Sequence, residues 1–283
     1  MSHPSISVII LVYNEADNIS ACIESVSWSD DVIVVDSFSS DDTLALARSC
    51  RRDVRIFENA FSDFGQQRNW ALDHCDPKHD WILFLDADER VTEELGDEMA
   101  AAVESDCSEV GYYLCYKNMF LGQWLKRCTF FPSWQLRLLK HGEVRYEKAG
   151  HGQREVAEGP LGFLDQPYDH FGFSKGIAAW IDRHNRYSTE EAEYFCTLSK
   201  QPLKLGELFS SDALVRRRAI KRIYARLPAR PLVRFVYTYI FRLGFLDGWR
   251  GLVIAVSDSN GTFYKYIKIH ADRAIERESQ RGG

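Results

Sequence analysis

Hydrophobic runs of strand length alternate with helical stretches over the first 110 residues of the chain. The runs are continuous and rich in β-branched residues, as in strands that are covered on both faces. Strands that alternate with helices of this length predict βαβ units and a parallel sheet. The strand-like runs are residues 6–12, 31–35, 54–57 and 81–85, and the helical stretches are 19–26, 41–48 and 65–74.

Polar residues follow three of these runs directly. Asn14 and Glu15 follow the first run, Asp36 and Ser37 the second, and residues 86–90 (DADER) the fourth. In open α/β sheets, ligands bind at the carboxyl ends of the strands, so we expect the functional site at this edge. The alternative for any single loop is that it is simply polar and that its Asp caps the next helix.

The pattern changes after residue 110, which suggests a division of the chain into three parts. Aromatic and β-rich segments broken by Gly and Pro occupy residues 111–169, and a helix capped by Ser174 is expected to reach about Cys196. We therefore predict a ligand-binding half at 1–110, a second half of the same domain at 111–200, and a helical extension at 201–283.

Charge is distributed unevenly along the 283 residues. The net charge of −6 averages a front part of −17 (residues 1–110, 24 acids against 7 bases) and a remainder of +11. An acidic front part would repel a phosphate backbone and no binding motif accompanies the bases, so nucleic acid is not expected as a partner. The start of the chain resembles no signal peptide, which predicts a cytoplasmic protein.

Asp86 and Asp88 flank Ala87 immediately after the most apolar strand. Two carboxylates held at a sheet edge suit a hard divalent cation. Mg²⁺ is usually held by one or two carboxylates together with substrate phosphates, so the pair predicts a phosphorylated ligand and Mg²⁺ or Mn²⁺ as cofactor.

With these motifs the chain resembles the inverting nucleotide-sugar glycosyltransferases of family 2, whose catalytic domain has the GT-A fold, an α/β fold with a Rossmann-like mixed sheet. The resemblance extends over about residues 5–195. Among these enzymes the chain looks most like the bacterial branch that adds sugars to the lipopolysaccharide core, such as core β-1,4-glucosyltransferases. The matching segments are residues 8–15 (VIILVYNE), 34–43 (VVDSFSSDDT), 67–69 (QRN), 84–89 (FLDADE) and, in the tail, 242–248 (RLGFLDG).

The resemblance implies roles for the residues at the sheet edge. Asp88 would bind the metal, with Asp86 beside it, and Arg68 would face the diphosphate as a permanently charged donor. The residues implied to bind the nucleotide sugar are Leu11, Val12, Tyr13, Glu15, Asp36, Arg68 and Asp86.

An inverting reaction also needs a base to deprotonate the acceptor hydroxyl. The candidates lie in residues 146–155 (YEKAGHGQRE), where Glu155 ranks first, His151 second and Glu147 third, although a surface or loop-capping role is as plausible for each. His170 could complete a metal shell or be a structural histidine. Arg183 and Arg186 could read a phosphorylated acceptor or form a solvated helix face.

The tail from Ala213 to Arg250 holds ten Lys and Arg and one acid, Asp247, interleaved with apolar and aromatic residues. Such a segment predicts contact with an anionic membrane, here the inner face of the cell membrane; packing of its apolar face on the catalytic domain is the alternative. The expected function is metal-dependent transfer of a hexose, from a UDP-glucose-like donor, to a lipopolysaccharide core or other lipid-linked glycan. The alternatives are a nucleotidyltransferase and an inactive sugar-nucleotide-binding protein.

Overall fold

The computed structural model of the protein describes residues 5–105, 108–149, 152–227 and 229–281. It divides into two compact units, and each is described by itself. The first unit comprises residues 1–124 and 130–175, and the second comprises residues 125–129 and 176–283.

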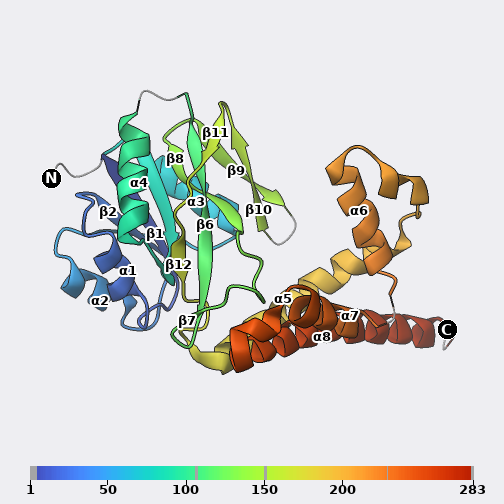
Figure 1. Ribbon diagram of the computed structural model, residues 1–283. Coiled ribbons are helices and arrows are strands. Elements are labelled where there is room, and N and C mark those ends of the chain that lie inside the picture. Colours follow the sequence, from blue (N-terminus) through green and yellow to red (C-terminus); the bar gives the residue numbers. More distant parts are fainter. Residues whose placement is uncertain (1–4, 106–107, 150–151, 228, 282–283) are drawn as a thin grey trace. The chain divides into compact units, whose positions relative to one another are not determined.

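The first unit is built on a ten-stranded mixed sheet (Figure 1). The strand order is β3-β2-β1-β4-β8-β6-β12-β5, with β7 and β11 also paired to β6. A separate antiparallel hairpin is formed by β9 and β10. The strands are β1 (Ile6–Val12), β2 (Val32–Asp36), β3 (Arg55–Glu58), β4 (Trp81–Asp86), β5 (Glu89–Arg90), β6 (Gly111–Phe120), β7 (Gln123–Trp124), β8 (Trp134–Lys140), β9 (Val144–Ala149), β10 (Gly152–Ala157), β11 (Leu161–Phe163) and β12 (Tyr168–His170).

Helices cover both faces of the parallel part of the sheet. Residues on alternate positions of β1, such as Val8 and Ile10, pack with α1, α2 and α4, whereas Ile9 packs with α3. This two-sided burial explains why the strands read as continuous apolar runs. The helices of this unit are α1 (Ile19–Ser25), α2 (Thr43–Cys50), α3 (Phe64–His74) and α4 (Glu93–Glu104).

The predicted α/β fold class is confirmed, and the four predicted strands of the front part agree with β1 to β4 within one residue at each end. β1 pairs in parallel with both β2 and β4, as expected for βαβ units. The sheet becomes mixed beyond β4, because β8 is antiparallel to both β4 and β6.

The second unit is helical. Its boundary falls at Lys175 rather than at residue 200, because α5 is a 25-residue helix that packs on α8 in this unit. The basic segment predicted as one amphipathic face is divided among several short elements. The unit contains α5 (Gly176–Lys200), η1 (Leu205–Phe209), α6 (Ala213–Tyr224), α7 (Arg230–Val236), the π-helical turn η2 (Tyr237–Phe241), η3 (Gly244–Asp247) and α8 (Gly248–Arg281). In the described parts of the chain, no helix combines the length and apolarity needed to span a membrane.

Two glycines of α8 predict opposite effects of the same substitution. A Cβ on Gly251 would lie 2.0 Å from the carbonyl oxygen of Gly244, whereas a Cβ on Gly261 would meet nothing within 4 Å. We expect Gly251→Ala to lower the free energy of unfolding by about 3 kcal/mol through overpacking. Gly261→Ala should raise it by up to about 1 kcal/mol, because Ala restricts the unfolded chain. Urea denaturation followed by circular dichroism measures both, and equal effects would contradict the close approach of η3 and α8.

Candidate active site

The strand register brings four predicted site residues to one edge of the sheet. Leu11 of β1 lies opposite Asp86 of β4, and Val12 lies opposite Asp36 of β2. Both carboxylates therefore end their strands on either side of β1. This edge, which we call the carboxylate edge, is formed by the ends of β1, β2 and β4 and the loops that follow them.

Asp86 is held by two arginines. Its Oδ1 lies 3.1 Å from Nη2 of Arg68 and its Oδ2 lies 2.8 Å from Nη2 of Arg137. Both arginine side chains are 4% exposed, whereas that of Asp86 is 36% exposed. Burial alone would raise the pKa of Asp86, but the charges of Arg137 and Arg68 outweigh it and hold the pKa well below its ordinary value. Asp86 is thus a fixed anion that still presents surface to a ligand.

Glu89 is a member of this cluster that the sequence did not suggest. Its side chain is 3% exposed, its Oε1 lies 2.5 Å from Nη2 of Arg137, and its Oε2 accepts a hydrogen bond from the backbone N–H of Asp86 at 2.9 Å. Burial raises the pKa of Glu89 to about 7, although Arg137 opposes the shift. Arg137 was missed as well; the available signal is a basic residue inside the apolar stretch Leu136–Leu139 of β8.

Asp88 lies beside His170. Oδ2 of Asp88 is 3.5 Å from Nε2 of His170, whose Nδ1 is 3.1 Å from Oδ1 of Asn118. Burial lowers the pKa of His170, but its interaction with Asp88 outweighs burial, so the pKa is raised. Within the described residues, no group of three or more His, Cys, Asp or Glu side chains is arranged to hold a metal ion. Among these residues, Asp86 and Asp88 are therefore not part of a metal site made of protein ligands alone.

The loops after β1 and β2 brace each other. Ser39 donates its Oγ–H to Asp36 at 2.5 Å and accepts the backbone N–H of Asn14 at 2.8 Å. Thr43 accepts the backbone N–H of Glu15 at 2.7 Å. Asp36 is fully buried, so its carboxylate shapes this loop pair from within.

Tyr13 and Glu15 follow β1 on this edge. The Tyr13 side chain is 59% exposed, whereas Glu15 lies 2.5 Å from the ammonium of Lys175 and 2.7 Å from the side-chain amide of Asn18. Burial raises the pKa of Glu15 despite these partners. The combination of an exposed ring and a half-buried carboxylate provides an apolar and a polar surface for a ligand.

The β9–β10 hairpin separates the candidate bases. Gln153 accepts a hydrogen bond from Nη1 of Arg68 at 2.8 Å, and Glu155, two positions further along β10, shares its face. Glu147 is 56% exposed and pairs with Arg154, which points to the opposite face. The predicted candidate His151 lies outside the described residues. Glu155 thus lies on the face of the hairpin that contacts Arg68 and Glu147 on the other face, and the structure adds Gln153, which the sequence did not single out.

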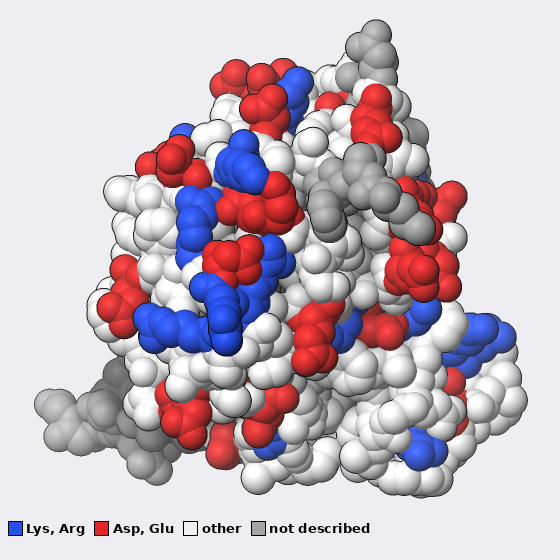
Figure 2. All heavy atoms as spheres, turned by 90° about the vertical axis from the view of Figure 1, so that its left-hand side faces the viewer, with Lys and Arg blue, Asp and Glu red and all other residues white. Residues whose placement is uncertain are grey.

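Acidic side chains are scattered over much of the face drawn in Figure 2, with Lys and Arg side chains between them. The charge of −17 over residues 1–110 is therefore not concentrated in one patch on this face. Chemistry at the carboxylate edge depends on a few placed groups and not on the overall charge of the front part.

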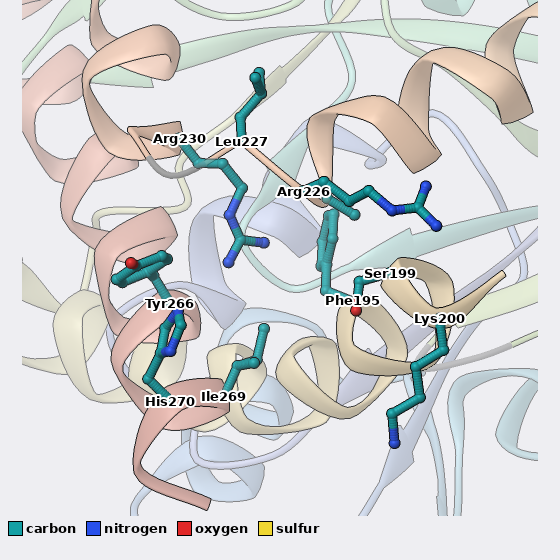
Figure 3. A pocket seen from close by; sticks show the side chains of 10 residues that line it. Phe195, Ser199, Lys200, Arg226, Leu227, Arg230, Tyr266, Ile269 and His270 are labelled. Carbon is teal, nitrogen blue, oxygen red and sulfur yellow. The ribbon is translucent and has the colours of Figure 1, made fainter. Parts of the chain in front are cut away.

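The second unit contains Arg183 and Arg186, both on α5, which therefore do not belong to the carboxylate edge of the first unit. It also contains a cavity of about 340 Å³, into which Arg230 points between Phe195 and Tyr266, at 5.7 and 5.4 Å from the ring centroids (Figure 3). None of its ten described lining residues is Asp or Glu. The cavity therefore lacks carboxylates of the kind that lie at the carboxylate edge.

The mixed sheet carries these carboxylates at the carboxyl ends of its parallel strands, where ligands bind in α/β folds. The chain belongs to glycosyltransferase family 2: the family model described as "Glycosyl transferase family 2" matches residues 7–151. The predicted family and the predicted enzyme class are thereby confirmed.

Relatives of this family match nearly the whole chain. The lipopolysaccharide core biosynthesis glycosyltransferase LpsC of Rhizobium meliloti (strain 1021) is 24% identical over 96% of this chain and 94% of its own length. The uncharacterized glycosyltransferase RP128 of Rickettsia prowazekii (strain Madrid E) is 37% identical over 93% and 86%. Among solved structures, the mannosyltransferase PcManGT of Pyrobaculum calidifontis, in complex with GDP-Man and Mn²⁺, has a TM-score of 0.50 and 15% identity over 95% of this chain and 88% of its own.

Proposed function

We propose that the carboxylate edge transfers a hexose, with inversion, from a nucleoside diphosphate to a hydroxyl of a glycan acceptor. The observation that carries this proposal is the arrangement of Asp86 and Asp88. One carboxylate is fixed by two buried guanidinium groups and the other lies beside a histidine. Asp86, which the two arginines hold, suits hydrogen bonds from a ribose. Asp88 suits a cation that binds a diphosphate. The pair therefore fits a ligand that has both groups.

The side chains at Asp88 fit a divalent cation. A carboxylate oxygen and an imidazole nitrogen lie 3.5 Å apart and both side chains are partly exposed, at 16% and 29%. Mg²⁺ or Mn²⁺ needs few protein ligands when diphosphate oxygens complete its shell. When bound, the cation would neutralise charge on the departing nucleoside diphosphate. Asp88 and His170 would hold it, while Asp86 would accept hydrogen bonds from the ribose.

The remaining residues position the donor. Tyr13 offers an exposed ring for the nucleobase, and Leu11 and Val12 form the end of β1 that positions it. Asp36 holds the loop through Ser39. Because Arg68 is 4% exposed and bound to Asp86 and Gln153, we assign it to positioning Asp86, in place of direct contact with the diphosphate.

Glu155 is the proposed base. It shares a face with Gln153, whose side chain reaches the Arg68 cluster, whereas Glu147 is engaged by Arg154 on the other face. A base must lie within hydrogen-bonding reach of the hydroxyl that it deprotonates. Replacing Glu155 by Gln removes the proton acceptor and keeps the shape, and Glu147→Gln is the matched control.

The acceptor and the location are proposed from the relatives and from the charge of the tail. The full-length similarity to LpsC supports a lipopolysaccharide core or other lipid-linked glycan. Arg183 and Arg186 are proposed to contact phosphates of that acceptor, and the donor is proposed to be UDP-glucose or a close relative. The enzyme would act at the cytoplasmic face of the cell membrane. Release of pyrophosphate would instead identify the nucleotidyltransferase alternative.

Removal of divalent cations tests the metal role. We expect EDTA to lower sugar transfer by at least about 100-fold, since the charge on the leaving diphosphate would lose its main counter-charge. Excess Mn²⁺ or Mg²⁺ should restore the rate. A rate that EDTA leaves unchanged would contradict the assignment of Asp88 as a metal ligand.

A further inference from the structure

The segment from Arg242 to Gly248 (RLGFLDG) is part of the family resemblance, yet nothing in the proposed sugar transfer uses it. It forms the turn between α7 with η2 and the long helix α8, which pack against each other (Figure 1). Gly244 and Asp247 of this segment are buried, whereas its three large apolar residues are exposed.

Asp247 fixes the turn from within. The residue is 6% exposed, and its carboxylate accepts the backbone N–H groups of Lys126, Arg127 and Cys128 at 3.2, 2.9 and 2.9 Å. One buried acid thus ties η3 to the segment Leu125–Thr129 of the same unit. Its negative charge is consumed by these three donors and does not face solvent.

Two further contacts keep the turn tight. A Cβ on Gly244 would lie 2.7 Å from the carbonyl oxygen of Thr238, so only glycine fits there. The Arg242 guanidinium donates to the carbonyl oxygen of Thr129 at 3.0 Å. The backbone of the turn is therefore held at both ends, and its exposed side chains project from a backbone that is fixed by these contacts.

Those outward side chains are large and apolar. Phe241 is 75% exposed, Leu246 60% and Trp249 57%, and Leu243 and Phe245 are at least 40% exposed. We call these five residues the apolar turn. Five such side chains within nine residues exceed the scattered exposure that is ordinary on a protein surface, and an apolar patch of this kind marks an interaction site.

Basic residues accompany the apolar turn. Lys126 and Arg127 are exposed beside Asp247, and Arg242 and Arg250 flank the turn in the sequence. Residues 120–130 and 237–257 contain no acid except the buried Asp247. The apolar turn is thus accompanied by four cations, and these segments add no accessible anion. Such a surface complements a partner that has an apolar interior and a negatively charged boundary.

We propose that the apolar turn inserts into the anionic headgroup region of a lipid bilayer, with Lys126, Arg127, Arg242 and Arg250 around it. This inference rests on the proposed action on a lipid-linked acceptor, and it narrows the predicted membrane contact from the whole segment 213–250 to the turn before α8. Phe, Leu and Trp side chains anchor proteins at the boundary between headgroups and acyl chains, and cations gain from the negative leaflet.

Co-sedimentation of the full chain with vesicles of phosphatidylcholine and phosphatidylglycerol tests the proposal. We expect the double variant Phe241→Ser/Leu246→Ser to lower vesicle binding by at least about tenfold, because two large apolar contacts are lost. Lys126→Gln/Arg127→Gln should lower it severalfold at low salt and weaken its salt dependence, since two of the four cations are lost. All four side chains are exposed, so folding should be unaffected.

Phe263→Ser is the matched control. Phe263 is 46% exposed on α8, about 21 Å along the helix from Trp249 at 1.5 Å per residue, and its loss should leave vesicle binding unchanged. Equal binding by wild type and the Phe241→Ser/Leu246→Ser variant would overturn the proposal. So would a wild-type dimer that this variant converts to a monomer with unaltered vesicle binding. Donor turnover in solution, measured in parallel, reports separately on the proposed sugar transfer.

Discussion

Asp88→Ala is expected to lower sugar transfer by at least about 10³-fold. The carboxylate is the proposed anchor of the divalent cation, and loss of such an electrostatic group typically costs two to three orders of magnitude or more. Initial rates of nucleoside diphosphate release at saturating donor and Mn²⁺ would measure the effect. The melting temperature of the variant should stay near that of wild type, because the Asp88 side chain is partly exposed and is not part of the hydrophobic core.

Asp97→Ala provides the control for Asp88→Ala. Asp97 is an exposed acid on α4, and its removal changes the net charge equally. We expect it to retain wild-type activity. An Asp88→Ala enzyme that transfers sugar within tenfold of wild type would show that the cation, if required, is held elsewhere.

Arg137→Leu is expected to lower the free energy of unfolding by about 3–5 kcal/mol. It removes the partner of the buried Glu89 and one of the two partners of Asp86, and a buried charge without its counter-ion is costly. Urea denaturation at pH 8 measures the effect, since Glu89, with a pKa raised to about 7, is then mostly ionised in the folded protein. At pH 6 the decrease in the free energy of unfolding should be smaller, because Glu89 is then mostly protonated and needs no counter-ion.

A second variant distinguishes charge from packing. In Arg137→Leu/Glu89→Leu both charges of the buried pair are gone, and Asp86 retains Arg68. Replacement of a buried ion pair by apolar residues is often neutral, so we expect the double variant to recover most of the lost stability. A double variant less stable than Arg137→Leu would contradict this account of the cluster.

The sheet around the site could be predicted from the sequence because its strands are buried on both faces. Ile6–Val12 matches β1 at both ends, and Trp81–Asp86 differs from the predicted strand by one residue. Parallel pairing then places Asp36 and Asp86 at one edge, which requires no knowledge of side chains. The turn chemistry of residues 36–43 was likewise readable, since Asp and Ser favour such loops.

The partners of the carboxylates could not be predicted. Arg137 lies on β8, antiparallel to β4, and its approach to Asp86 and Glu89 depends on a pairing between segments about 50 residues apart. Gln153 reaches Arg68 across 85 residues. Local periodicity carries no information about such distant pairings.

The tail illustrates a different limit. Composition indicated a basic amphipathic segment at 213–250, but the chain there divides into α6, α7, η2 and η3, and the apolar turn is created by Gly244 and by Asp247 binding a distant segment. Neither contact leaves a periodic signal in the sequence.

The most direct test of the central claim is ³¹P NMR of the phosphorus products formed from UDP-, GDP- and ADP-sugars with Mn²⁺ or Mg²⁺ and an acceptor extract. We expect one donor to yield its nucleoside diphosphate, EDTA to stop the reaction, and Asp88→Ala not to support it. Formation of pyrophosphate, or binding of a donor with no turnover of any sugar, would contradict it.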